Sequence, residues 1–204
     1  EVASVGRSLG NLLSDKLIPE NPENKLIPEI GTIVSTACLA HDLGNPPFGH
    51  SGEAAISNFF MKGGGQEFQS KLTEGEWKDF THFDGNANAF RLLTHQFNGK
   101  RPGGFALTYS TLASIVKYPF ESVLASKPKF GFFQSEKNDY QKIAEELEII
   151  SQPDNLESFV RHPLVYLVEA ADDICYQIMD LEDAFKLGIL SFNETKNLYS
   201  GLDR

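Results

Sequence analysis

The segment HDLGNPPFGHSGE, residues 41–53, decides how this sequence folds, because it brings two histidines and two acidic residues together around a sharp chain break. It directly follows the apolar run GTIVSTACLA, residues 31–40, which has the periodicity of a buried helix. A charged His41-Asp42 pair at the end of such a helix is unfavourable unless a partner compensates it. Imidazole and carboxylate groups are standard ligands of divalent ions, so one cation could compensate both side chains at the loosened helix end.

The composition is that of one compact globular domain, with 204 residues, 41% apolar and 23% charged. A net charge of −10 makes the chain as a whole repel nucleic acid and anionic membranes. No apolar stretch approaches the roughly 20 residues of a membrane-spanning helix. Cys38 and Cys175 lie inside helical patterns, which predicts reduced packing cysteines and a cytoplasmic protein. Because the sequence opens within a helical pattern and without an initiator methionine, we expect a fragment of a longer protein.

Lysines gather in one window of this acidic chain. A local excess of positive charge on an acidic protein could serve a phosphorylated ligand. A solvated lysine face is the alternative, and charge alone does not decide between the two. The lysines of this window are Lys117, Lys127, Lys129, Lys137 and Lys142.

Apolar residues recur at helical spacing along almost the whole chain, which predicts an all-α fold without a repeat or a domain linker. Asp84 and Thr108 are expected to cap two of the helices. Ser191 and Glu194 have the spacing of a capping box ahead of the last one. Residues 66–83 are expected to be irregular. The expected helices cover about residues 1–14, 30–41, 51–61, 84–97, 108–117, 138–150, 163–188 and 191 onward.

The longest expected helix carries Asp172, Tyr176 and Asp180 at intervals of four residues, so that they share one narrow stripe. Apolar residues flank this stripe, and a buried carboxylate there must be paired, hydrogen-bonded or bound to a metal ion. The alternative is that the acids face a lysine or solvent, and both interpretations stay open. The flanking apolar residues are Ala171, Ile174, Cys175, Ile178 and Met179.

His50 and Glu53 follow the chain break three residues apart, which makes them neighbours on one turn of a helix. A histidine paired with a carboxylate is an oriented acid–base group that can be tuned for proton transfer. His-Asp dipeptides by themselves arise by chance, and a histidine that caps a helix is the commoner case. The functional interpretation therefore depends on the whole of segment 41–53.

Segment 41–53 resembles the signature of the deoxyguanosinetriphosphate triphosphohydrolase (dGTPase) family within the HD-domain superfamily. Four further blocks resemble parts of that family in the same order, so the resemblance extends over nearly the whole chain. These blocks are FDGNANAFRLL (83–93), KYP (117–119), KFGFFQSEK (129–137) and EAADDICYQIMDLEDA (169–184). The resemblance implies that residues 1–204 form a single HD-domain helical bundle, as part of a longer protein.

The resemblance implies metal-dependent hydrolysis of dGTP, or of other deoxynucleoside triphosphates, to the deoxynucleoside and inorganic triphosphate. It assigns His41, Asp42 and Asp172 as ligands of a divalent metal ion, Mg²⁺ or Mn²⁺ in the first place. A further histidine ligand of the family would lie just ahead of the first residue. Water would attack the α-phosphorus, with His50 as the catalytic histidine and Glu53 as the carboxylate that works with it.

Further positions match the substrate contacts of the family. Tyr176 and Asp180 match positions at the deoxyribose, where Asp180 would accept a hydrogen bond from the 3′-hydroxyl. Asn45 stands where many members have histidine, which implies an altered rate or metal preference rather than lost activity, since its amide can still bind a phosphate oxygen. The remaining implied contacts are a substrate-contacting asparagine, Asn86, and three triphosphate-side residues, Lys117, Tyr118 and Lys129.

The resemblance also implies a homo-oligomer, and it leaves open an effector such as single-stranded DNA or a nucleotide. Two other functions stay open beside the dGTPase activity. One is an HD-type nucleotide phosphohydrolase or phosphodiesterase, which would release orthophosphate or a linear dinucleotide. The other is a truncated, inactive core that binds nucleotides without cleaving them.

Overall fold

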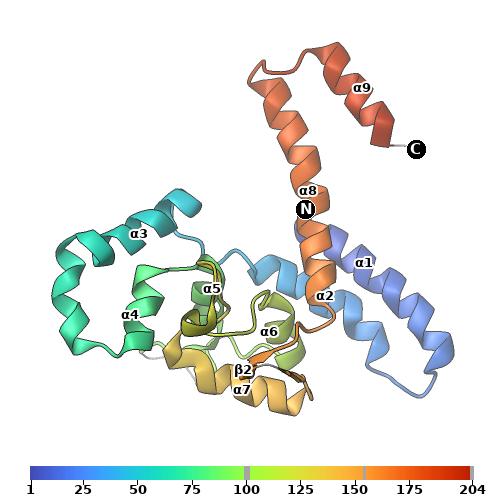
Figure 1. Cartoon of the computed structure of the whole chain (residues 1–204). Coiled ribbons are helices and arrows are strands. Elements are labelled where there is room, and N and C mark those ends of the chain that lie inside the picture. The colour runs from blue at the N-terminus through green and yellow to red at the C-terminus, as the bar shows by residue number, and fades with distance from the viewer. Residues whose placement is uncertain (99–101, 154, 203–204) are drawn as a thin grey trace.

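A computed structural model describes residues 1–98, 102–153 and 155–202 of the chain (Figure 1). Within these ranges the fold is all-α apart from one short antiparallel hairpin, as the helical periodicity predicts. The α-helices are α1 (Val2–Leu17), α2 (Ile30–Ala40), α3 (His50–Lys62), α4 (Glu74–Thr81), α5 (Gly85–Thr94), α6 (Tyr109–Ile115), α7 (Lys137–Glu146), α8 (Val165–Lys186) and α9 (Phe192–Leu202). The 3-10 helices are η1 (Ile18–Glu20), η2 (Ile27–Glu29), η3 (Gly64–Lys71), η4 (Ser122–Leu124) and η5 (Gln134–Glu136), and the strands are β1 (Ser151–Gln152) and β2 (Asn155–Phe159).

Helices α1, α2 and α8 pack against one another and form one side of the body (Figure 1). Glycines let α1 and α2 approach closely, because a Cβ at Gly10 would lie only 2.7 Å from the Cα of Gly31. Cys38 and Cys175 are free and buried, as expected for packing cysteines. Burial raises the pKa of Cys38 to about 11, with smaller contributions from Asp172 and Cys175, so this thiol stays protonated.

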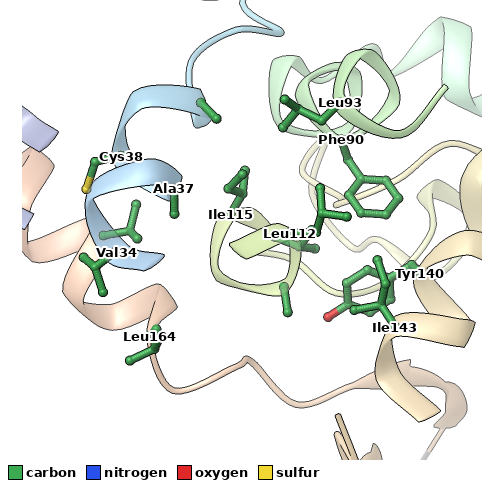
Figure 2. Packing of buried hydrophobic residues seen from close by; sticks show 14 of the residues in the cluster. Val34, Ala37, Cys38, Phe90, Leu93, Leu112, Ile115, Tyr140, Ile143 and Leu164 are labelled. Carbon is green, nitrogen blue, oxygen red and sulfur yellow. The ribbon is translucent and has the colours of Figure 1, made fainter. Parts of the chain in front are cut away.

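The hydrophobic core continues from α2 through α6 to α5 and α7 (Figure 2). Val34 and Ala37 of α2 are fully buried on this side. Aromatic rings fill the far end, where Phe90 meets Tyr140 at a centroid distance of 5.8 Å and Phe132 stacks on Tyr140 at 4.8 Å. This continuous packing fixes α2 relative to α5, and the candidate functional residues lie where these two helices end or begin.

The loop after α2 is clamped to α5 by a glycine. A Cβ at Gly44 would lie 2.0 Å from the backbone nitrogen of Ala89 and 2.1 Å from the carbonyl oxygen of Gly85, so only glycine fits. The side-chain amide of Asn88 donates a hydrogen bond of 2.8 Å to the carbonyl oxygen of Gly44. The segment that follows His41 is therefore held against the first turn of α5.

The predicted caps are confirmed, whereas one stretch expected to be irregular is helical. Asp84 and Thr108 cap α5 and α6, and Ser191 forms with Glu194 the capping box that precedes α9. Residues 66–83 were expected to be irregular, and that prediction is wrong, because most of η3 and all of α4 lie there.

Three boundaries also differ from the prediction. Helix α1 continues to Leu17 rather than ending near residue 14, and α5 ends at Thr94 rather than near residue 97. Helix α7 ends at Glu146, before a residue with positive φ, Glu148 (φ 53°), and the two strands of the hairpin follow. Left-handed backbone ends a helix wherever it occurs.

Helix α8 leaves the body of the molecule halfway along its length (Figure 1). Its first half is buried through Val165, Val168, Ala171 and Cys175, whereas its second half and α9 project outward. Large apolar side chains are exposed along this projecting part, namely Met179, Phe185, Leu187, Ile189, Phe192 and Leu198. None of the described helices combines the length and the apolar character needed to cross a membrane.

Candidate active site

His41 caps the C-terminus of α2, and a hydrogen bond fixes its ring there. Its Nδ1 atom lies 2.8 Å from the carbonyl oxygen of Cys38. Because a carbonyl oxygen only accepts hydrogen bonds, Nδ1 carries the proton and Nε2 keeps its lone pair. The end of α2 thus presents Nε2 of His41 as a base or a metal ligand.

Nε2 of His41 lies between carboxylates from two separate segments. It is 3.5 Å from Oδ1 of Asp42 and 3.6 Å from Oδ1 of Asp172 on α8. The same nitrogen is buried and has no hydrogen-bond partner in the described part of the chain. The packing of α8 against α2 therefore brings together the three side chains that the sequence singled out.

These donor atoms fit a divalent ion as a partial ligand set. Two atoms that each bind an ion at about 2.1 Å and stand about 3.5 Å apart subtend roughly 110°, which is an ordinary coordination angle. Among residues 1–98, 102–153 and 155–202, no three His, Cys, Asp or Glu side chains are already gathered around one point as a finished metal site. The three residues are instead joined pairwise through His41, with its orphaned nitrogen in the middle.

The charge around Asp172 is only partly compensated by the protein. Burial raises the pKa of Asp172, and the carboxylates of Asp42 and Asp173 raise it further. His41 and Lys117 act in the opposite direction but do not outweigh these effects. A cation at this point would lower the pKa again, because it favours the ionised carboxylate.

A second cluster lies at the N-terminus of α5, around Glu53 of α3. Oε1 of Glu53 accepts a hydrogen bond of 2.7 Å from the first backbone N–H of α5. Oε2 lies 3.5 Å from the ammonium of Lys129, which is also 3.7 Å from Oδ1 of Asp84. Asp84 is fully buried and accepts hydrogen bonds from the backbone and the side chain of Asn86. Three expected site residues thus share one network around a buried carboxylate, whose pKa burial raises.

Asn45 connects the two clusters. Its Nδ2 atom donates a hydrogen bond of 2.9 Å to Oδ1 of Asp42. On its other side, a Cβ at Gly85 would lie 2.2 Å from Oδ1 of Asn45 and 3.1 Å from Oε1 of Glu53. Because Gly85 has no Cβ, the side chains of Asn45 and Glu53 can both approach its backbone. The two clusters thus form one continuous polar site across α2, α3, α5 and α8.

His50 opens α3 at the edge of this site and is exposed. The chain turns into α3 through two consecutive left-handed residues, Phe48 (φ 69°) and Gly49 (φ 54°). Within the described residues, His50 has no hydrogen bond and no ion pair. The expected pairing of His50 with Glu53 is not formed; the two oxygens of Glu53 instead contact an N–H of α5 and the ammonium of Lys129.

Lys117 and Tyr118 border the first cluster beside the N-terminal half of α8. Lys117 pairs with Glu169 at 2.5 Å, and Arg161 contacts the same carboxylate at 3.0 Å. Both cations stand over the ring of Tyr118, at 5.9 Å and 5.6 Å from its centroid. Burial alone would lower the pKa of Lys117, but the hydrogen bond and the charge of Glu169 raise it, so this side chain remains a cation.

The lysine window does not form one basic face. Lys117 and Lys129 lie at the site and are paired with carboxylates there. Lys137 is paired elsewhere, with the buried carboxylate of Glu121 at 2.6 Å. The window therefore supplies two cations to the candidate site, and its other lysines lie outside it.

Tyr176 and Asp180 lie on the projecting half of α8, one and two turns beyond Asp172. Both side chains are exposed, and in the part of the chain that the structure describes they form no hydrogen bond or ion pair. The apolar residues that flank the stripe are not all buried, because Ile174 and Met179 are exposed at 44% and 45%. The stripe shares one helix face, but only Asp172 reaches the cluster around His41.

Three residues of the site were not identified from the sequence as functional. Asp84 was predicted only as a helix cap, because its complete burial beneath Lys129 leaves no trace in the sequence. Glu169 lies one turn before Asp172, a helical spacing that was visible in the acidic block 169–184. Arg161 has no sequence signal, since it reaches Glu169 from the loop ahead of α8.

A helical bundle in which a His-Asp pair at a helix end meets an aspartate of a distant helix has the arrangement of an HD-domain protein. No family model matches the chain. Over 99% of its length it is 47% identical to a Pseudomonas aeruginosa protein named "Deoxyguanosinetriphosphate triphosphohydrolase-like protein", of which it covers 46%. A Synechocystis protein of the same name is 45% identical over 94% of the chain, which covers 47% of it.

The deoxyguanosinetriphosphate triphosphohydrolase of Yersinia pestis is 37% identical over 95% of the chain, which covers 44% of that protein. Over nearly its whole length the chain is thus similar to proteins named as dGTPases or dGTPase-like. It spans about half the length of the curated relatives that it matches.

Proposed function

We propose that this chain is the catalytic core of a metal-dependent deoxynucleoside triphosphate triphosphohydrolase, with dGTP as the first substrate to test. The observation that carries the proposal is the meeting of Asp172 with His41 and Asp42, at one end of a polar site that also holds Glu53 and Lys129. The names of the relatives support the choice of a nucleotide substrate.

His41, Asp42 and Asp172 would hold the divalent ion. Mg²⁺ and Mn²⁺ are the first candidates, because two of the three donors are carboxylates and the third is an imidazole. When bound, such an ion would polarise the α-phosphate and neutralise the charge that develops on it during attack. Burial of His41 Nε2 without a partner supports this assignment.

In the proposed reaction, a bond forms between a water oxygen and the α-phosphorus, and the bond from that phosphorus to the 5′ oxygen breaks. The electron pair stays on the 5′ oxygen, which takes up a proton, and inorganic triphosphate is released. His50 would deliver that proton in its protonated form, or accept one from the attacking water as a base. Glu53, one turn along α3, would orient His50 for either role.

The remaining side chains would bind and orient the substrate. Lys117 and Lys129 are half-buried cations at opposite ends of the site, which suits a chain of phosphates between them. Asn45 lies between the two clusters, where an amide can bind a phosphate oxygen. Tyr176 and Asp180 stand about 6 and 12 Å along α8 from Asp172, given a rise of about 1.5 Å per residue, and their exposed side chains would hold the deoxyribose.

Product analysis on the full-length protein tests the proposed function. We expect dGTP with Mg²⁺ or Mn²⁺ to give deoxyguanosine and inorganic triphosphate in equal amounts. Release of orthophosphate or pyrophosphate from dGTP would contradict the proposal, and so would cleavage of a cyclic dinucleotide in place of dGTP. A protein that binds dGTP without cleaving it would be the inactive nucleotide-binding alternative.

We also propose that the full-length protein forms a homo-oligomer. The large apolar side chains exposed on the second half of α8 and on α9 support this, because a protein seldom leaves so many unburied. Light scattering coupled to size-exclusion chromatography gives the mass directly. A mass of one chain at micromolar concentration would contradict the proposal.

A further inference from the structure

We propose that Lys129 is a substrate-operated latch, which holds Glu53 away from His50 in the free enzyme and releases it when a triphosphate binds. The proposal rests on the proposed function, because it assigns a trigger to the same site. Its starting point is that the His50–Glu53 pair is absent although the two residues lie on one turn of α3. Lys129 occupies the oxygen of Glu53 that would otherwise be available to His50.

The two oxygens of Glu53 differ in the strength of their interactions. Oε1 accepts a hydrogen bond of 2.7 Å from the backbone N–H of Gly85, which is fixed at the start of α5. Among the described residues, Oε2 has only the ammonium of Lys129 as a partner, at 3.5 Å, which is long for an ion pair. A change of partner at Oε2 leaves the carboxylate anchored through Oε1.

Lys129 can leave this position while its loop stays in place. The next residue, Phe130, donates its backbone N–H to Oδ2 of Asp84 at 3.1 Å, and Gly131 donates to the carbonyl oxygen of Phe120 at 3.0 Å. The lysine side chain itself is 29% exposed, and its ammonium is carried on a flexible chain of four carbons. A bound triphosphate carries more negative charge than one carboxylate, so it competes for the ammonium.

Asp84, the other partner of Lys129, tolerates its departure. It keeps hydrogen bonds from the backbone N–H of Asn86 at 2.9 Å, from the side chain of Asn86 at 2.8 Å and from Phe130 at 3.1 Å. These three N–H donors favour the ionised carboxylate and so oppose the effect of burial, which raises the pKa of Asp84. In the described part of the chain, Lys129 is the cation that forms an ion pair with Glu53.

The latch gives the site a way to recognise a complete polyphosphate. His50 is exposed and has no partner among the described residues, so it can turn toward Oε2 of Glu53 as soon as Lys129 leaves. A nucleotide too short to reach Lys129 would bind without assembling the acid–base pair. The enzyme would then cleave triphosphates and leave shorter nucleotides intact.

The test measures the protonation midpoint of His50 in the full-length protein. Hydrogen exchange at the histidine C2 position, followed by mass spectrometry across a pH series, reports each histidine separately and involves no turnover. The probe is inorganic triphosphate, with sodium sulfate at equal ionic strength as the blank. His95, which packs against Phe97 outside the site, serves as the internal reference.

We expect the midpoint of His50 to rise by about 1 unit when triphosphate is added to the wild type, since a paired carboxylate favours the protonated ring. In Glu53→Gln the rise should be clearly smaller, because only the charge of the ligand remains. In Lys129→Met the midpoint should already be raised without ligand, while Lys129→Arg should behave as the wild type.

Equal rises in the wild type and Glu53→Gln, or an unchanged midpoint in ligand-free Lys129→Met, would overturn the latch. If Lys129→Met does not fold, the comparison of the wild type with Glu53→Gln decides alone. Failure of the proposed function would look different, because it would show as absent triphosphate release from dGTP, whatever the exchange measurement gives.

Discussion

The orientation of a single ring determines what the candidate site can bind. His41 is held by the carbonyl oxygen of Cys38 at one nitrogen, so the other nitrogen faces the carboxylates of Asp42 and Asp172 with its lone pair free. A buried imidazole nitrogen without a partner is unfavourable unless a ligand completes it. This is the residue-level reason to expect an ion rather than a plain salt bridge.

Metal affinity should distinguish Asp172 from its neighbour Asp173. We expect Asp172→Asn to weaken Mn²⁺ binding at least about 10-fold, because it removes a charged donor next to His41. Asp173→Asn is the matched control, since that side chain is exposed and forms no ion pair with His41 among the described residues. Isothermal titration of the full-length variants measures both, and equal losses would contradict the ligand assignment.

His50 should separate catalysis from metal binding. We expect His50→Ala to lower the turnover of dGTP at least about 100-fold, because proton transfer by a positioned side chain contributes that much. The affinity for Mn²⁺ should stay within a factor of about two, since His50 does not contact His41, Asp42 or Asp172. Loss of metal in this variant equal to that of Asp172→Asn would show that the two roles are not divided in this way.

Asp79 should make stability depend on pH. Burial raises its pKa to about 6, helped by the charges of Glu121 and Glu136, while in the unfolded chain an aspartate titrates near 3.9. Between about pH 4 and 6 the folded state therefore holds a proton that the unfolded chain has lost, and stability falls as pH rises through this window. In Asp79→Asn the fall should be smaller by about 3 kcal/mol, measured by urea unfolding. The same fall in Asp79→Asn as in the wild type and in the exposed control Asp139→Asn would contradict it.

The sequence predicted individual site residues well where they belong to a motif, and it did not predict the partners that come from distant segments. The spacing in segment 41–53 and the acid at Asp172 predicted residues that do meet. Local spacing also suggested that Glu53 pairs with His50, whereas in the structure Glu53 pairs with Lys129, which comes from a distant loop. No local pattern indicates which loop will cover a given carboxylate.

Among the elements, the contact between the loop after α2 and the first turn of α5 matters most. It places Asn45 between the two clusters and depends on Gly44, where the backbones touch. The same two elements carry His41 at one side and Gly85, the donor to Glu53, at the other. A shift of this contact would therefore pull the two halves of the site apart.

Gly44→Ala tests this contact. The added Cβ would meet the backbone of α5 at 2.0 Å, where no flexible side chain can give way. We expect a loss of about 2 kcal/mol or more in the free energy of unfolding, by analogy with overpacked cores, together with a drop in dGTP turnover. Gly201→Ala in α9 is the control, because a Cβ there meets open space. Wild-type stability in Gly44→Ala would show that the loop is not clamped.

Helix periodicity predicted the long elements well and the short ones poorly. Helix α4 was missed because its eight residues carry little apolar periodicity. The capping box of Thr73 and Glu76 is the sequence signal that could have predicted its start. The hairpin after α7 was missed because its strands of two and five residues are shorter than the pattern that signals a strand. Caps and turns, which depend on one or two residues, were the more reliable local signals.

At the scale of the whole molecule, the main feature is the projecting part formed by the second half of α8 and by α9, which carries two of the expected substrate contacts. Tyr176 and Asp180 stand on this exposed part, beyond the cluster around His41. Sequence periodicity gave this helix an apolar face, but it could not tell whether that face is covered within this chain or by other parts of the protein. The chain covers about half the length of its relatives. The dGTPase activity is therefore proposed for the full-length protein.

The most direct test of the account is a crystal structure of the full-length protein with Mn²⁺, located by its anomalous scattering. We expect one strong peak about 2.0–2.3 Å from Nε2 of His41 and from carboxylate oxygens of Asp42 and Asp172. A peak elsewhere, with Nε2 of His41 hydrogen-bonded to a protein group, would contradict the claim that these two helices join to hold a metal ion.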